Sequence, residues 1–189
     1  LLTGNAGFHL EAHIQGRADL SIRIGVAVVI MLISLIGGRI IPSFTRNWLV
    51  RENPGRLPIP CNRFDTATVA TSVIALALWV ALPNAVIAGL ALTLAGVLQA
   101  VRLGRWAGYR TFSDRLVLVL HIGYLFVPTG FLLTAAACFG WLAPSAGLHA
   151  WMAGAAGVMT LAVMTRASLG HTGQRLAASI STQAIYGAA

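Results

Sequence analysis

The sequence predicts an all-α fold, a polytopic transmembrane helix bundle of about five complete spans plus the end of a sixth. The first observation is composition: 57% of the 189 residues are hydrophobic and only 10% are charged, whereas soluble domains carry roughly 25% charged residues. The second is a mean hydropathy of +0.79. The third is the position of the charges, because arginines separate long apolar runs. An apolar soluble bundle, the alternative, would scatter its charges along helix faces.

Five apolar stretches are long enough to cross a bilayer. A hydrocarbon core about 30 Å thick requires about 20 helical residues, and a helix satisfies every backbone amide within its own segment. Each stretch lacks acidic residues and nearly lacks basic ones. The predicted spans are 22–38, 66–82, 85–101, 116–140 and 147–165.

The start of the chain, residues 1–10, is also apolar, and we expect it to be the end of a sixth helix. Because the chain opens with Leu1 rather than Met and has no charged leader, we expect it to be part of a longer protein. Residues 1–189 would then form a single transmembrane domain. Its partners would be the lipid bilayer and the remaining N-terminal helices of the same protein.

Two long linkers carry most of the basic residues. The linker 39–65 contains five arginines and four prolines, a composition incompatible with one continuous helix. The linker 102–115 contains four arginines. The short connections at 83–84 and 143–146 carry no charge. We therefore predict that 39–65 and 102–115 are loops on one side of the membrane.

The distribution of the arginines indicates the orientation of the chain. All 13 basic residues are arginine, and alternating spans place only Arg17 and Arg23 on one side, with the other eleven opposite. The positive-inside rule then places 39–65, 102–115 and the C-terminal tail in the cytoplasm. Orientation accounts for the net charge of +8, so we do not expect nucleic acid as a partner.

Histidine is the residue type best suited to bind a metal in this chain, because imidazole ligates haem iron, copper and zinc. His121 lies about two turns inside the span 116–140, on one helical face with Val117, Tyr124 and Pro128. A polar ring at that depth requires a partner or a ligated metal. The alternative to a ligand role is a hydrogen bond from His121 to a neighbouring helix.

His149 begins a ladder of small residues in the last predicted span. The ladder would allow either close helix packing or a planar cofactor alongside, and His149 itself could equally face water or lipid headgroups. The ladder consists of Ala153, Gly157, Thr160 and Met164.

The remaining histidines lie near the two ends of the chain. His171 falls just beyond the last span, either as a loop residue or as a ligand that turns back toward the bilayer. His9 and His13 are four residues apart, which would place both on one helical face. The pair does not form the metalloprotease motif HExxH, because Leu10 follows the first histidine.

The sequence lacks features of several other function classes. Proton- or cation-coupled transporters usually hold Asp or Glu within the membrane, whereas all five acidic residues here lie in loops or at span ends. No phosphate-binding glycine loop and no nucleophile elbow occurs. A carrier driven by an intramembrane carboxylate is therefore disfavoured, and we expect no defined enzymatic activity.

Two long strings carry a family resemblance. They are GGRIIPSFTRN at residues 37–47 and MTLAVMTRASLGHTG at residues 159–173. Shorter similarities lie at residues 8–10 (FHL), 120–124 (LHIGY) and 148–150 (LHA). With these strings the sequence resembles the NnrS family over nearly its whole length. That family has about twelve spans, so the resemblance implies that this chain is its C-terminal half without the last helix.

The resemblance implies a haem- and copper-associated, multi-pass protein of the bacterial cytoplasmic (inner) membrane that takes part in the response to nitric oxide and nitrosative stress. Haem, copper and nitric oxide are thus expected binding partners. His121 and His171 would lie in the cytoplasmic half of the membrane and the other matching histidines in the periplasmic half, which implies two separate metal positions. The candidate haem or metal ligands that match family positions are His9, His121, His149 and His171.

Arg39, Arg46 and Arg166 lie at the predicted cytoplasmic boundary, where they would hold haem propionates or another anion through paired hydrogen bonds. Their simpler role is to set the topology and to bind lipid phosphate. Two other functions are alternatives to the nitric oxide response. One is a membrane transporter or export component without a redox cofactor, and the other is a structural partner of another membrane complex.

Overall fold

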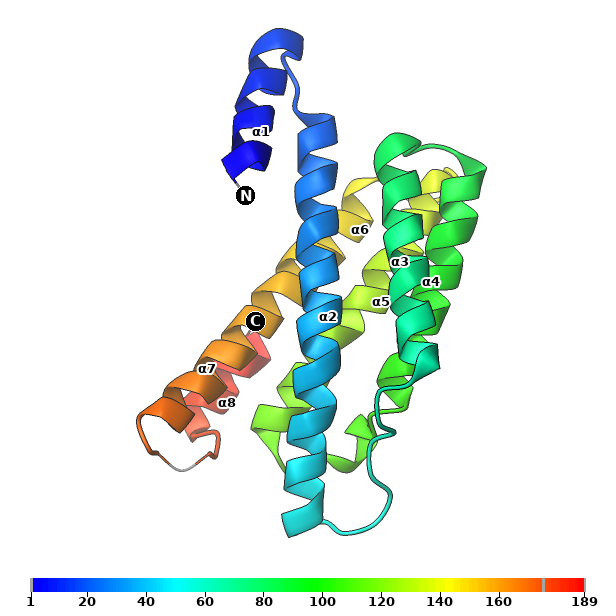
Figure 1. The fold of residues 1–189 in the computed structure, drawn as a ribbon. Helices are drawn as coiled ribbons and strands as arrows, with labels where there is room; N and C mark the ends of the chain where they lie inside the picture. The colour runs from blue at the N-terminus through cyan, green and yellow to red at the C-terminus, as the bar shows by residue number, and fades with distance from the viewer. Residues whose placement is uncertain (1, 175, 189) are drawn as a thin grey trace.

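The computed structural model describes residues 2–174 and 176–188, and in that part of the chain the secondary structure is entirely helical (Figure 1). This confirms the all-α class predicted from the composition. Five helical segments are long and apolar enough to cross a membrane, as the sequence predicted. They are Asp19–Glu52, Arg63–Ala81, Val86–Arg110, Arg115–Cys138 and Ser145–His171.

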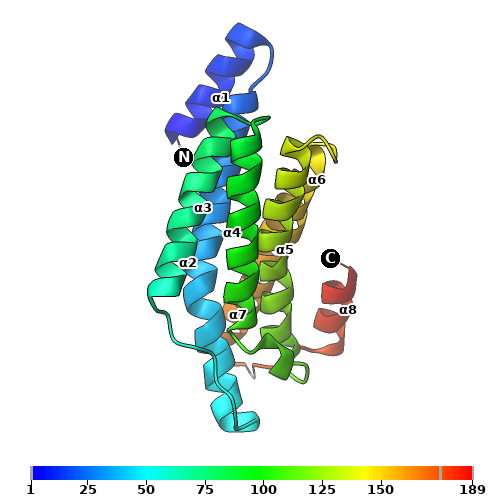
Figure 2. The same ribbon diagram turned by 90° about the vertical axis from the view of Figure 1, so that its right-hand side faces the viewer.

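The helices stand side by side in a bundle, which the last span crosses at a slant (Figures 1 and 2). The first four spans contain α2 (Asp19–Glu52), α3 (Arg63–Ala81), α4 (Val86–Gly104) and α5 (Arg115–Cys138). The fifth consists of α6 (Ser145–His149), a π-helix (Ala150–Val158) and α7 (Met159–His171). The shorter helices are α1 (Leu2–Gln15), the 3-10 helix Gly108–Arg110 and α8 (Ile180–Ala188).

α1 contains most of the apolar start of the chain and folds back beside the first turns of α2 (Figure 1). Glu11 fixes this arrangement, because its carboxylate accepts the backbone N–H groups of Leu20 and Ser21 at 2.9 and 2.8 Å. Hydrogen bonds from Ser21 and Leu20 also lower the pKa of the Glu11 carboxyl below its usual value. The carboxylate thus caps the positive end of the α2 dipole.

α2 continues past the predicted end of the first span. Its 34 residues correspond to about 50 Å at 1.5 Å per residue, against a hydrocarbon core of about 30 Å. The structure therefore corrects the expectation that 39–65 is a loop, because Arg39–Glu52 belong to α2 and only residues 53–62 connect it to α3.

Pro42 lies inside α2 without ending it. A proline removes its own N–H, which would have reached the Gly38 carbonyl, and neighbouring groups in a membrane bundle can satisfy a backbone freed in this way. The Arg102 guanidinium packs directly against Gly38 and donates from Nη1 to the Ser34 carbonyl oxygen at 3.1 Å. A cationic donor thus lies at the part of α2 that the proline weakens.

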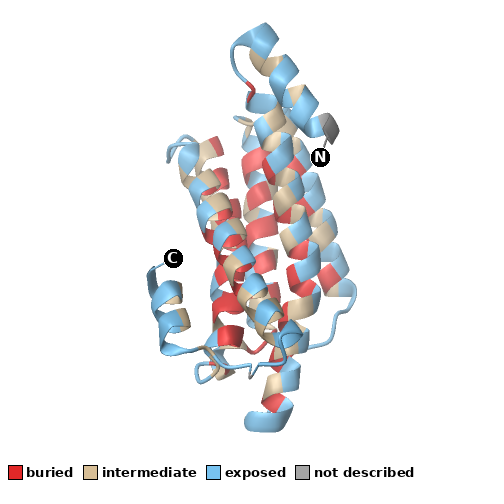
Figure 3. Cartoon of the chain, turned by 90° about the vertical axis from the view of Figure 1, so that its left-hand side faces the viewer, coloured by how far each residue is buried: buried red, intermediate tan, exposed pale blue. Residues whose placement is uncertain are grey.

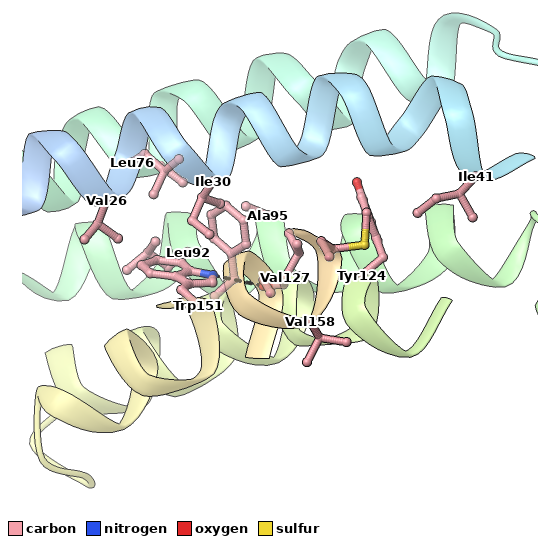
Figure 4. Close-up of a cluster of buried hydrophobic side chains, with 14 of the residues drawn as sticks. Val26, Ile30, Ile41, Leu76, Leu92, Ala95, Tyr124, Val127, Trp151 and Val158 are labelled. Atoms are coloured by element: carbon pink, nitrogen blue, oxygen red, sulfur yellow. Dashed lines mark hydrogen bonds between the residues drawn. The ribbon is translucent and has the colours of Figure 1, made fainter. Parts of the chain in front are cut away.

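The buried residues line the inward faces of the helices (Figure 3). Large apolar and aromatic side chains from all five spans meet there, including the fully buried Ile30, Leu92, Tyr124 and Trp151 (Figure 4). The outward faces carry exposed aliphatic side chains such as Val73. Apolar surfaces on both sides of each helix are typical of a bundle in lipid.

α5 and the last span pack closely through glycines. Gly130 leaves the space that the Trp151 indole occupies, and Gly154 leaves the space of the Phe126 ring. The predicted small-residue ladder lies on the other side of the span. The ladder residues do not pack against another described helix of this chain, because all four are exposed: Ala153, Gly157, Thr160 and Met164.

The two cysteines offer a test of the orientation. Both are free, and Cys61 is exposed between α2 and α3 whereas Cys138 ends α5 at the opposite end of the bundle (Figure 1). In a Cys138→Ser variant, we expect a membrane-impermeant maleimide to label Cys61 in inside-out vesicles but not in spheroplasts, because the arginine-rich end should face the cytoplasm. A Cys61→Ser variant is the control. Labelling of Cys61 in spheroplasts would contradict the orientation.

Candidate functional site

His121 lies in the first half of α5, and its side chain is 7% exposed. Asp114 sets the start of this helix, because its carboxylate accepts two backbone N–H groups of the first turn at 2.9 and 3.2 Å. The helical spacing of the sequence correctly predicted the buried face that His121 shares with Val117, Tyr124 and Pro128.

The hydrogen-bond partners of His121 indicate one tautomer. Nδ1 lies 3.1 Å from the Val117 carbonyl oxygen, and only a protonated Nδ1 can donate to that oxygen. Nε2 lies 3.4 Å from Thr45 Oγ1, but the Thr45 hydroxyl donates its proton to the Ile41 carbonyl oxygen at 2.8 Å. The Nε2 lone pair therefore does not accept the proton of the Thr45 hydroxyl. A metal-ligating imidazole has this form, with its other N–H on a backbone carbonyl.

A buried ion pair joins the start of α3 to the end of α4. Arg102 Nε donates to Asp65 Oδ1 at 3.0 Å, and the two side chains are only 4% and 6% exposed. Arg105 Nη2 lies 3.7 Å from Asp65 Oδ2. The same carboxylate accepts the Asn62 backbone N–H at 3.0 Å, as part of the capping box that begins α3. Asp65 is therefore held by side chains and backbone at once.

A series of hydrogen bonds extends from this ion pair into the bundle. Arg102 Nη1 donates to the Tyr124 hydroxyl at 3.2 Å, and that hydroxyl donates to Gln99 Oε1 at 2.8 Å. Gln99 Nε2 donates to Ser72 Oγ at 3.0 Å and lies 3.3 Å from Ser34 Oγ. All five side chains are buried. Polar groups of α2, α3, α4 and α5 thus form one network.

Trp106 and Tyr124 place this polar network beside His121. The Trp106 and Tyr124 rings pack edge to face with centroids 4.7 Å apart, and the Arg102 guanidinium lies 5.5 Å from the Trp106 ring centroid. Tyr124 follows His121 by one turn of α5, and Gly108 lies directly against the His121 ring. The arginine-rich half of the bundle therefore holds one buried imidazole next to fixed polar groups.

Comparison with protein families agrees with this membrane bundle. The profile of the family described as NnrS protein matches residues 1–189. The chain belongs to the NnrS family. Comparisons with curated proteins and with solved structures found no match. The family and the five membrane-spanning helices together make this NnrS chain a multi-pass membrane protein.

Of the four candidate histidines of this NnrS chain, three are exposed: His9 in α1, His149 at the end of α6 and His171 at the end of α7. His149 and His171 belong to one span and are 22 residues apart, or about 33 Å along a helix. One metal ion therefore has no access to both. Among residues 2–174 and 176–188, no group of three or more His, Cys, Asp or Glu side chains lies together as a metal site.

The three candidate arginines of the NnrS chain differ in their surroundings. Arg39 and Arg46 are exposed on α2, whereas Arg166 on α7 is half-buried. The Arg166 guanidinium lies 4.3 Å from the centroid of the Phe44 ring, a cation–π contact that fixes the side chain. Arg166 is thus the candidate that the fold holds in place.

The polar network is the part of the site that sequence reasoning missed. Asp65 and Arg102 were assigned to loops or span ends, and Asp65 does lie in the first turn of α3. The sequence does contain a signal for the pairing of these two residues. An acidic residue that starts one span and a basic residue that ends the next, antiparallel span lie at the same depth in the membrane. That rule would have paired Asp65 with Arg102 across the hairpin of α3 and α4.

Proposed function

We propose that this NnrS-family chain belongs to a haem- and copper-associated protein of the bacterial cytoplasmic (inner) membrane that protects the cell from nitric oxide. His121 would supply a ligand to haem iron or to copper. The observation that carries this proposal is the buried imidazole whose Nδ1 donates to the Val117 carbonyl oxygen and whose Nε2 has no proton from Thr45. Family membership supports the response to nitric oxide.

The donor chemistry at His121 fits one metal–ligand bond. The Val117 carbonyl fixes the ring orientation and leaves Nε2 basic, the role that outer partners of metal-bound histidines play. The neighbouring side chain at Nε2 is Thr45, and no second histidine of the four candidates is buried beside it. His121 would therefore be the one histidine that holds the group at this position. A haem held there would supply the site at which nitric oxide binds.

The other residues of the site would control access and orientation. His121, Tyr124 and Trp106 are buried, so they would exclude bulk water from the bound group. The Arg102 guanidinium, fixed by Asp65 and Tyr124, would keep a positive charge nearby. The role proposed for the site is therefore to bind nitric oxide.

A second metal position would involve His9 or His149. α1 and α6 both lie at the end of the bundle opposite the loop between α2 and α3 (Figure 1), and His149 Nδ1 is 2.7 Å from the Ser145 carbonyl oxygen. This again leaves Nε2 as the metal-binding atom. His171 would remain a candidate at the arginine-rich end.

The optical spectrum of the purified full-length protein tests the first position. We expect His121→Ala to weaken haem binding at least ~10-fold, since loss of even an outer partner of a metal ligand costs about 10–100-fold. His13→Ala, at an exposed position outside the set of candidate ligands, is the matched control, and copper content should be measured in all three proteins. A Soret band that His121→Ala leaves unchanged would remove His121 from haem ligation.

A transporter or export component without a redox cofactor is the second candidate. The buried Asp65–Arg102 pair favours it, because ionisable residues inside a membrane bundle often mark transport pathways. This candidate predicts purified protein free of haem and copper, together with substrate flux in proteoliposomes that an Arg102→Met variant abolishes. Haem-loaded protein without flux would exclude it.

A further inference from the structure

A cavity of about 690 Å³ opens at the arginine-rich end of the bundle. The end of α2, the turn before α5, α7 and the segment that leads into α8 form its walls. Its lining contains three arginines, Arg51, Arg115 and Arg166, and two acidic residues, Glu52 and Asp114. The cavity is thus a polar, positively charged space at the boundary of the membrane, separate from His121.

Arg166 provides the main evidence that the cavity suits an anion. Its guanidinium lies against the Phe44 ring, and among the described residues its buried Nη1 atom has no hydrogen-bond partner. A buried cationic donor without an acceptor is strongly unfavourable. An anion in the cavity would supply that acceptor after a small rotation of the Arg166 guanidinium, because Nη1 itself is shielded from solvent.

The acidic side chains only partly neutralise the three arginines. Among the described residues, none of Arg51, Arg115 and Arg166 forms an ion pair with a carboxylate. Asp114 Oδ1 is already occupied, since it accepts the two backbone N–H groups at the start of α5. Glu52 is exposed at the end of α2. Among the described residues, the lining therefore has a net charge of +1, and Arg166 Nη1 is an unused N–H donor.

We infer that this cavity binds a phosphate group, with Arg166 as the buried donor and Arg51 and Arg115 as outer donors. The planar guanidinium matches the oxygens of phosphate through two parallel hydrogen bonds. Trp48 in the wall is of the residue type enriched at the membrane–water interface. The phosphate comes either from an anionic lipid headgroup of the cytoplasmic leaflet or from a soluble phosphate.

The test uses delipidated full-length protein in a neutral detergent, titrated with inorganic phosphate in one arm and short-chain phosphatidic acid in the other. We expect Arg166→Gln to weaken binding about tenfold or more, because it removes a charged donor. Arg63→Gln, an exposed arginine outside the cavity, should bind as the wild type does. Saturable binding of phosphatidic acid alone identifies the lipid source, and equal binding of inorganic phosphate identifies the soluble one.

Several results would overturn the inference. One is the absence of saturable binding in either arm, and another is an equal loss of binding in Arg166→Gln and Arg63→Gln. A third is a fall in the haem content of Arg166→Gln with phosphate binding unchanged, which would indicate a propionate contact. If Arg166→Gln does not fold, Arg51→Gln replaces it, because Arg51 is exposed and lines the same cavity. Haem loading at His121 is measured separately, so failure of either proposal leaves the other testable.

Discussion

Replacement of Arg102 by Met is expected to lower the free energy of unfolding by about 3–5 kcal/mol. The substitution would leave the Asp65 carboxylate buried without its closest cation. It would also remove the donor to the Ser34 carbonyl and to the Tyr124 hydroxyl. Reversible unfolding in mixed detergent–SDS micelles, followed by circular dichroism, measures the change.

Two matched variants make this prediction specific. Arg63→Met removes an exposed arginine and should change the free energy of unfolding by less than about 0.5 kcal/mol. Asp65→Asn with Arg102→Met removes both charges yet keeps an acceptor for the cap of α3, so it should be more stable than Arg102→Met alone. A double variant no more stable than the single one would contradict the ion-pair explanation.

Trp151→Ala is expected to lower the free energy of unfolding by about 3 kcal/mol. The Trp151 ring is fully buried, packs edge to face on Phe131 and Trp79 with centroids 5.2 and 5.5 Å away, and fills the space beside Gly130. In lipid, helix association depends on such packing rather than on the hydrophobic effect. The expected loss of unfolding free energy is therefore at the lower end of the range for the same substitution in soluble protein cores. The same micelle assay measures it.

Trp151→Phe separates ring packing from hydrogen bonding. Phenylalanine keeps an aromatic ring beside Phe131 but loses the indole N–H that donates to the Val127 carbonyl oxygen at 3.1 Å. We expect a loss of about 1 kcal/mol. If Trp151→Phe were as unstable as Trp151→Ala, the hydrogen bond rather than packing would hold the last span against α5.

The spans were predictable because the bilayer constrains the length and the apolar composition of each helix independently of the others. A run of about 20 apolar residues specifies a membrane helix whatever its neighbours are, and each of the five predicted runs lies within or overlaps a helix of the structure. The burial of His121 was predictable for a similar reason, since its spacing from Val117 and Tyr124 depends only on the helical repeat. The surroundings of the His121 Nε2 atom were not predictable, because the neighbouring Thr45 comes from another helix.

Features that depend on contacts between helices escaped prediction. Pro42 indicates a helix end in soluble proteins, but here Arg102 of a neighbouring helix lies against the weakened turn. The small residues after His149 were compatible with a packed face or with a cofactor alongside, and the face that packs within this chain contains Gly154 and Trp151 instead. Side-chain size alone does not say which side of a helix meets its neighbour. The cavity around Arg166 likewise could not be predicted, because separate segments of the chain meet to form it.

The hairpin of α3 and α4 also bears on how the protein enters the membrane. An arginine within a membrane helix opposes insertion by the translocon, whereas Arg102, in the last turn of α4, and Asp65 partly neutralise each other once the two helices pair. The short turn around Pro83 keeps the helices together from synthesis onward. α3 and α4 should therefore leave the translocon as a unit, and Asp65→Ala should increase the fraction of nascent chains in which α4 fails to insert.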